Sequence, residues 1–230
     1  MTVRTEIRPT PAQARPKWWR RPWVAPLALL VAAFLAYSVP PYLTFDPALS
    51  RVPAPPGFAA HYGFLVAHIL FGTIAIVGVI LQIWPWLRRT HPVVHRRVGR
   101  VYVFAGAIPS ALMALVIAPF SSFGPAAAGL NVVAALLWLG STIAGWRAIR
   151  QRRYADHRKW MVRSFAMAMN TLLSRVYAPL AFLGLGPSYP KLGELIPAAS
   201  TLAGTMSMLT LLLLSQWWLD RKPKKPAIAR

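Results

Sequence analysis

The chain contains no cysteine, and it has only five acidic residues against twenty-six lysines and arginines. Without cysteine it has no disulfide, no thiolate metal site and no cysteine nucleophile. It also lacks a phosphate-binding glycine loop, a His-Glu-x-x-His zinc motif and a serine triad, so hydrolase and transferase chemistry has no group placed to carry it. What the chain has in abundance is apolar surface, because 56% of its residues are hydrophobic.

Six segments approach or exceed the roughly eighteen apolar residues needed to cross a bilayer. Backbone groups in lipid must bond within their own segment, and these runs are continuous rather than alternating, so they predict helices. We therefore expect an all-α polytopic membrane bundle of six transmembrane helices over residues 23–219, flanked by basic tails at 1–22 and 220–230. The expected spans are Trp23–Tyr42, Gly63–Leu87, Val101–Phe120, Leu130–Trp146, Trp160–Leu183 and Leu195–Leu219.

The basic residues gather on one side of this predicted bundle. Segments 1–22, 88–100, 147–163 and 220–230 hold six, five, seven and five of them, which is twenty-three of the twenty-six. Short loops rich in Lys and Arg remain in the cytoplasm, so both termini are expected there, in the bacterial cytoplasmic (inner) membrane. The charge is thus a topology signal with a secondary attraction to anionic lipid, and no nucleic-acid partner is expected.

Two loops on this side each carry a histidine followed by basic residues. "HPVVHRRVGRVY" contains His95 and opens the third span, and "ADHRKWMVRSF" contains His157 and opens the fifth. The two histidines are candidate axial ligands of one b-type haem between these helices, since haem iron binds imidazole nitrogen. Anions also bind at helix N-termini, so the basic neighbours are expected to contact lipid headgroups. These neighbours are Arg96, Arg97, Arg100, Arg158, Lys159 and Arg163.

A second polar group lies deeper in the predicted bundle. His68 is five residues inside the second span, and Arg175 is about eight residues from the outer end of the fifth, so the two share a similar depth. No predicted span contains a carboxylate that would pair with Arg175. Two interpretations stay open: the guanidinium reaches the outer headgroups, or it joins an internal site for an anionic ligand or lipid. The candidate ligand-binding residues of that site are His68, Arg175, Tyr177 and Asn170.

The segments "AHILFGTIAIVGVILQIWPWLRRTHPVVHRRVGRVYVFAG", "DHRKWMVRSFAM" and "LSR" resemble a bacterial family catalogued as predicted membrane proteins of unknown function. The positions that carry the resemblance are His68, His95, Gly99, Arg100, His157, Arg158, Trp160, Met161, Arg163 and Arg175. The architecture is also similar, more loosely, to the b561-type and ferric-reductase-like membrane cytochromes. That resemblance implies haem binding and a quinone partner, although the fourth span has no histidine to face His68.

Three functions therefore remain open from the sequence. The first is an integral membrane protein with an intramembrane His/Arg site for an anionic ligand or lipid. The second is a b-type haem protein that exchanges electrons with quinone. The third is a structural subunit of an oligomer or a larger membrane complex.

Overall fold

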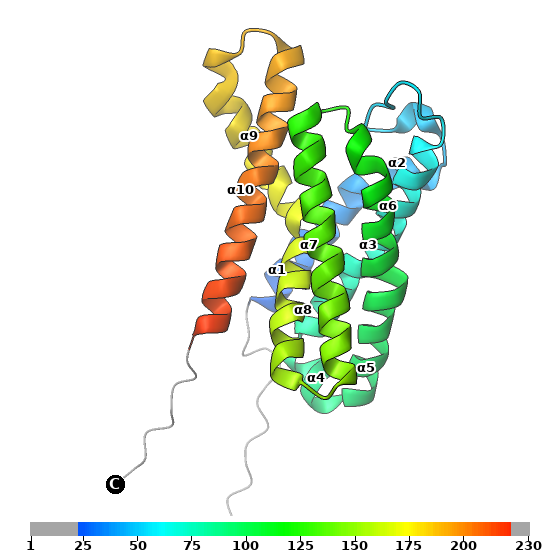
Figure 1. The fold of residues 1–230 in the computed structure, drawn as a ribbon, viewed down its shortest axis with the longest axis vertical. Coiled ribbons are helices and arrows are strands. Elements are labelled where there is room, and N and C mark those ends of the chain that lie inside the picture. The colour runs from blue at the N-terminus through cyan, green and yellow to red at the C-terminus, as the bar shows by residue number, and fades with distance from the viewer. Residues whose placement is uncertain (1–22, 222–230) are drawn as a thin grey trace, which may run out of the picture.

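A computed structural model describes residues 23–221 of the chain (Figure 1). The predicted basic tails, residues 1–22 and residues 222–230, lie outside the described residues. Every regular element in the described part is helical, and none is a strand. The all-α prediction is therefore confirmed for this part of the chain.

Within residues 23–221, four helical stretches are long and apolar enough to cross a membrane. Three are single helices, namely α3 (His61–Ile83), α7 (Pro125–Arg150) and α10 (Leu192–Asp220). The fourth runs without interruption over Pro92–Phe120. It consists of α5 (Pro92–Val101), a π-helical segment η3 (Tyr102–Ala107), α6 (Ile108–Ile117) and a 3-10 turn η4 (Ala118–Phe120). These stretches coincide with four of the six predicted spans.

The two other predicted spans have a different form. The first is a 15-residue apolar helix, α1 (Val24–Ser38), followed after one residue by the short α2 (Pro40–Leu43). The fifth is divided at Met169 into α8 (Tyr154–Ala168) and α9 (Asn170–Leu185). Ser207 of α10 stands beside this break, because its hydroxyl lies 2.8 Å from both carbonyl oxygens of Asn170. Local side-chain bonds of this kind compete with the regular helix ladder.

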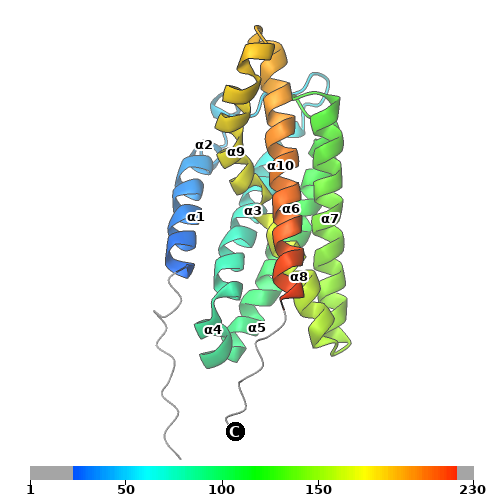
Figure 2. The ribbon, with the colours of Figure 1, turned by 90° about the vertical axis from the view of Figure 1, so that its left-hand side faces the viewer.

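The helices run roughly parallel to one long axis, and the chain turns at the two ends of the bundle (Figures 1 and 2). One end holds α4 (Pro85–Thr90), the start of α5 and the α7–α8 turn, together with the start of α1 and the end of α10. The opposite end holds α2, η2 (Pro47–Leu49), the α6–α7 turn and η5 (Gly186–Ser188). The two loops that contain His95 and His157, called the His-Arg loops below, thus lie at one end, as the charge pattern predicts.

Proline sets the start of several helices at these turns. Pro85, Pro92 and Pro125 each occupy the first position of their helix. The backbone N–H at that position has no acceptor within the helix, so proline, which lacks this N–H, costs no hydrogen bond there. Trp84 precedes Pro85 in extended conformation and so ends α3. Gly124 precedes Pro125 at φ +90°, a value that side-chain-bearing residues rarely adopt.

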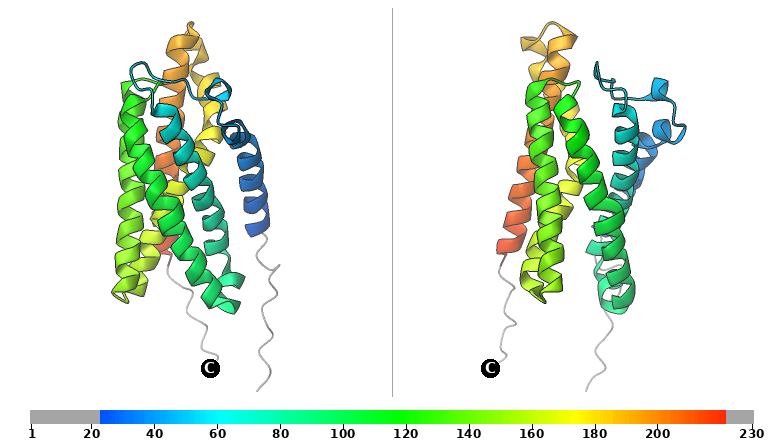
Figure 3. Two further views of the ribbon diagram at one scale, coloured as in Figure 1. Left: turned by 90° about the vertical axis from the view of Figure 1, so that its right-hand side faces the viewer. Right: turned by 45° about the vertical axis from the view of Figure 1, so that its right-hand side comes forward.

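The core of the bundle lies where η3 packs against α3. A Cβ atom added at Gly106 would stand 2.9 Å from backbone atoms of Ala75, so only glycine allows this approach. Next to the contact, Tyr102, Thr142 and Ser164 are fully buried and hydrogen-bonded to one another. The α1 helix lies at the edge, beside α3, where Val31 packs with Ile76 and Leu172 (Figure 3).

Candidate functional site

A cavity of about 310 Å³ opens within the half of the bundle that is predicted to face the outside. Its walls come from α1, α3, α6, α7, α8 and α9 and from the loops at that end. The ionisable and amide side chains that line it include Arg51, His61, His68, Asn131, Asn170 and Arg175. Among the described residues that line the cavity, none is Asp or Glu. Three of the four predicted ligand-binding residues therefore share one cavity.

His68 is held in a fixed orientation by α6. Its Nδ1 atom lies 2.9 Å from the carbonyl oxygen of Ser110, and the Ser110 hydroxyl donates to the His68 carbonyl oxygen at 2.9 Å. Because a carbonyl oxygen only accepts, Nδ1 carries a proton and donates it. The other ring nitrogen, Nε2, has no hydrogen-bond partner among the described residues, so it is the ring atom left for a ligand.

His61 begins α3 two turns above His68 and lines the same cavity. Its side chain is only 4% exposed, and its ring meets Phe58 edge to face. Neither ring nitrogen of His61 has a hydrogen-bond partner within residues 23–221. A buried imidazole without a protein partner is costly unless water or a ligand satisfies it.

Arg51 reaches the rim of the cavity from the loop before α3. Its Nη1 donates to the carbonyl oxygen of Tyr37 at 2.6 Å, and its guanidinium stacks over the Tyr37 ring at 3.9 Å. One face of this cation is thus occupied by the C-terminal end of α1. It still contributes positive charge to the site.

Arg175 and Asn170 approach the cavity from α9. No hydrogen bond or ion pair joins the Arg175 guanidinium to any described residue, and the side chain is exposed. Asn170 and Thr171 are the first two residues of α9, and both line the cavity. The start of a helix carries a partial positive charge, and broken membrane helices commonly direct such ends at anions. At this break Met167 and Ala168, the last residues of α8, also line the cavity, so the C-terminal end of α8 lies beside the N-terminal end of α9.

Tyr177 does not share this arrangement. Its hydroxyl lies 3.0 Å from Thr210 Oγ1 on α10, and it packs with the cluster that joins α9 to α10. Tyr177 lies two positions after Arg175, which places the two side chains on different faces of α9. Tyr177 is therefore not among the residues that line the cavity.

His95 and His157 lie together at the opposite end of the bundle. His95 lies on α5 and His157 lies in the first turn of α8, and the starts of both helices are at this end (Figure 1). His157 Nδ1 donates to the carbonyl oxygen of Gly145 at 2.8 Å, whereas His95 Nδ1 is buried and has no partner among the described residues. The His95 backbone is fixed by Gln82, which donates to its carbonyl oxygen at 2.8 Å. Neither histidine lines the 310 Å³ cavity.

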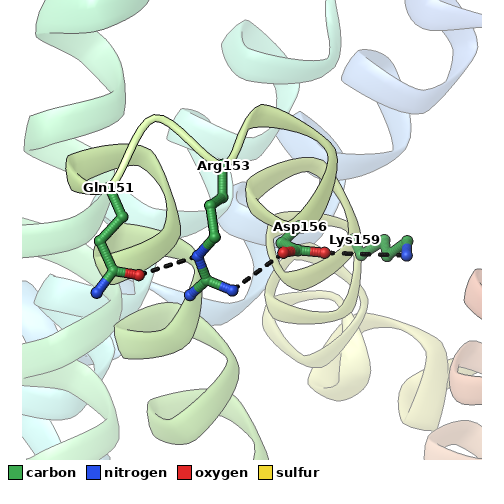
Figure 4. A network of polar contacts seen from close by, with 4 residues as sticks. All are labelled: Gln151, Arg153, Asp156 and Lys159. Atoms are coloured by element: carbon green, nitrogen blue, oxygen red, sulfur yellow. Dashed lines mark hydrogen bonds and ion pairs between the residues drawn. The ribbon is translucent and has the colours of Figure 1, made fainter.

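The basic residues near these histidines differ in their surroundings. Arg96, Arg97, Arg100, Arg158 and Lys159 are exposed. Arg163 instead donates to Gln216 on α10 at 3.0 Å and stacks on Trp160. In the α7–α8 turn, Asp156 accepts from Arg153 at 3.0 Å and lies 3.9 Å from the ammonium of Lys159 (Figure 4). An acidic residue thus offsets part of the positive charge of this turn.

Three polar residues of the cavity were not among the predicted ligand-binding residues, namely Arg51, His61 and Asn131. Arg51 lies in the loop before α3, His61 begins α3, and Asn131 lies near the start of α7. A polar side chain in an otherwise apolar span was the available signal for Asn131. The sequence does not predict that Arg51 contacts Tyr37 of α1, because the two residues are fourteen positions apart and a loop joins them.

The chain was compared with families of known proteins, with curated proteins and with solved structures. The family model described as "Predicted membrane protein (DUF2306)" matches residues 65–218. No curated protein and no solved structure matches the chain significantly. The matched range contains α3 from its fifth residue through most of α10, and so includes His68, His95, His157 and Arg175.

Proposed function

The chain belongs to this family of membrane proteins of unknown function, and we propose that it binds an anionic amphiphile in the cavity between α1, α3 and α9. The observation that carries the proposal is the composition of the cavity wall. It combines Arg51, Arg175, His61 and His68 and includes no described acidic residue.

The charge balance favours an anion as the occupant. An arginine within the span of a membrane protein is costly unless it meets a partner, a cavity or the headgroup layer. Arg175 has no hydrogen-bond or ion-pair partner in the described part of the chain. A carboxylate or phosphate would neutralise its charge, and hydrogen bonds to charged groups are among the strong ones.

The deeper wall of the cavity favours an apolar tail. Ile76, Ala135, Trp138, Met167 and Ala168 line it on the side away from Arg51. A volume of about 310 Å³ stands at the lower end of the usual range for small-molecule sites. The wall therefore suits a single acyl chain below a charged headgroup.

The proposal includes a topology of six transmembrane segments in the bacterial inner membrane. In it, α1 with α2 forms the first crossing, and α8 with α9 forms the fifth. Both termini and both His-Arg loops face the cytoplasm, which is supported by the positive charge of those loops. The cavity then lies in the outer leaflet, within reach of amphiphiles in that layer.

The test is saturable binding of a tetradecanoate probe to the detergent-purified protein. Arg175→Gln is expected to weaken binding by about tenfold or more, since a charge-assisted hydrogen bond contributes roughly 1.5–3 kcal/mol. Arg89→Gln is the matched control, because Arg89 is exposed on α4 and does not line the cavity. Equal affinities for Arg175→Gln and wild type would remove the anion site.

A second candidate function is b-type haem binding by His95 and His157 with quinone as electron partner. It is favoured by the orientation of His157, since metal-ligating imidazoles usually donate their other N–H to a carbonyl or carboxylate. His95 fits less well because its Nδ1 has no such acceptor in the described residues. A pyridine haemochrome spectrum decides it: protein from haem-supplied cells that shows no Soret absorbance rules the haem out.

A further inference from the structure

The bond between His68 and Ser110 determines what the ring can offer to a ligand. With Nδ1–H donated to the Ser110 carbonyl oxygen, the neutral ring presents a lone pair at Nε2. The Ser110 hydroxyl donates its own proton to the His68 carbonyl oxygen, and its oxygen lies 3.1 Å from Nδ1 as a second acceptor for the Nδ1–H. Ser110 is fully buried, so this arrangement is shielded from water.

Contact between an anionic headgroup and this lone pair is unfavourable. Carboxylate and phosphate oxygens are acceptors, and two acceptors repel unless a proton lies between them. Arg51 and Arg175 donate in any case, because an arginine stays protonated. The contact at His68 is therefore the one that requires an additional proton.

Resting on the proposed function, we propose that the cavity binds each anionic headgroup together with one proton, shared between a ligand oxygen and His68 Nε2. The balance is one anion and one proton taken up per site, whether the proton arrives on the acid or on the ring. The occupant is thus held as an acid, and its affinity depends on pH.

Other titratable or charged groups face the same space. His61 comes from α3 itself, Arg51 from the loop before it, Tyr37 and Tyr42 from α1 and α2, and Arg175 from α9. The lining residues of α6, α7 and α8 include none that titrates. Neither ring nitrogen of His61 is committed to an acceptor among the described residues, so His61 presents an N–H without taking up a proton. His68 cannot do the same, because its only N–H is already donated to the Ser110 carbonyl oxygen.

The test is calorimetric titration of the detergent-purified, full-length protein with tetradecanoate near neutral pH, in two buffers with different enthalpies of ionisation. Detergent blanks are subtracted, because micelles also protonate fatty acids. Wild type is expected to take up about one proton per ligand, so that its affinity falls about tenfold per pH unit as the solution becomes more alkaline. His68→Gln supplies an amide N–H, so it is expected to bind without proton uptake. His61→Gln is the matched control and is expected to keep the uptake.

Each outcome separates this inference from the proposed function. Saturable binding to wild type without proton uptake overturns the inference and leaves the anion site standing. Loss of uptake in His61→Gln, with uptake retained in His68→Gln, overturns the assignment to His68. Absence of any saturable binding to wild type removes the proposed function itself. A thermal melt of each variant shows that it is folded, and His68→Asn replaces His68→Gln if the latter is not.

Discussion

The hydroxyl of Tyr102 lies 2.6 Å from Ser164 Oγ, and both residues are completely buried. The bond joins the π-helical segment η3 to α8 across sixty-two positions of sequence. Ser164 continues to Thr142 on α7 at 2.7 Å, and Thr142 Oγ1 lies 2.7 Å from the carbonyl oxygen of Trp138, to which it donates. Three helical stretches thus share one hydroxyl network in the middle of the bundle.

Tyr102→Phe is expected to lower stability by about 1–3 kcal/mol, because the Trp138 indole N–H and Ser164 lose a buried partner. The measurement is the thermal unfolding midpoint in detergent. Tyr154→Phe is the matched control, since Tyr154 is 66% exposed and makes no hydrogen bond through its hydroxyl within residues 23–221. Equal midpoints for the two variants would show that the network does not stabilise the fold.

Gly106→Ala is expected to destabilise the bundle by about 1–3 kcal/mol, the usual cost of overpacking. The added Cβ would meet Ala75 backbone atoms at 2.9 Å, and backbone cannot move aside as a flexible side chain does. Gly140→Ala is the control inside α7, where nothing lies within 4 Å, and it is expected to be neutral or to stabilise by about 0.5–1 kcal/mol. Chemical unfolding of both variants compares them, and a destabilised Gly140→Ala together with an unaffected Gly106→Ala contradicts this packing.

Asp156→Asn is expected to change stability by less than about 1 kcal/mol, because its two ion pairs are exposed and such pairs contribute little. The variant removes the acceptor shared by Arg153 and Lys159 in the α7–α8 turn (Figure 4). Thermal midpoints measured at low and high salt check this. A large loss that high salt abolishes would mean that the ion pairs support the turn.

Single cysteines are expected to report the proposed topology, since the chain has no cysteine of its own. In spheroplasts, an impermeant maleimide should label Ser188→Cys at the α9–α10 turn and spare Gln151→Cys at the α7–α8 turn. Permeabilised cells should label both, which shows that each thiol is accessible. Labelling of Gln151→Cys from outside would reverse the orientation.

The sequence predicts the helical class and the location of the main spans because hydrophobic length is a local property of the chain. The sequence is less informative where a span is interrupted. The apolar pattern of the fifth span continues through Met169, so the sequence does not predict the division there. In the structure, Ser207 contacts Asn170 beside this division. The π-helical form of η3 is likewise not indicated by the local sequence, and within it Gly106 packs closely against α3.

The candidate site likewise combines features that the sequence predicts with features that only the structure shows. The missing carboxylate beside Arg175 left both a bound anion and headgroup contact open from sequence, and the similar depths of His68 and Arg175 predicted that the two could meet. Tyr177 does not line the cavity, because its hydroxyl contacts α10, and helical periodicity does not say which neighbour a face will contact.

By itself, the sequence determined the all-α class, the apolar lengths and the one-sided placement of positive charge, since each is carried by neighbouring residues. Only the tertiary structure decided which polar groups share a cavity, that Arg51, His61 and Asn131 join it, and that Ser110 fixes the tautomer of His68. Those relationships connect residues on different helices, 42 positions apart in the case of Ser110 and His68. The packing of the helices, which no local pattern specifies, brings them together.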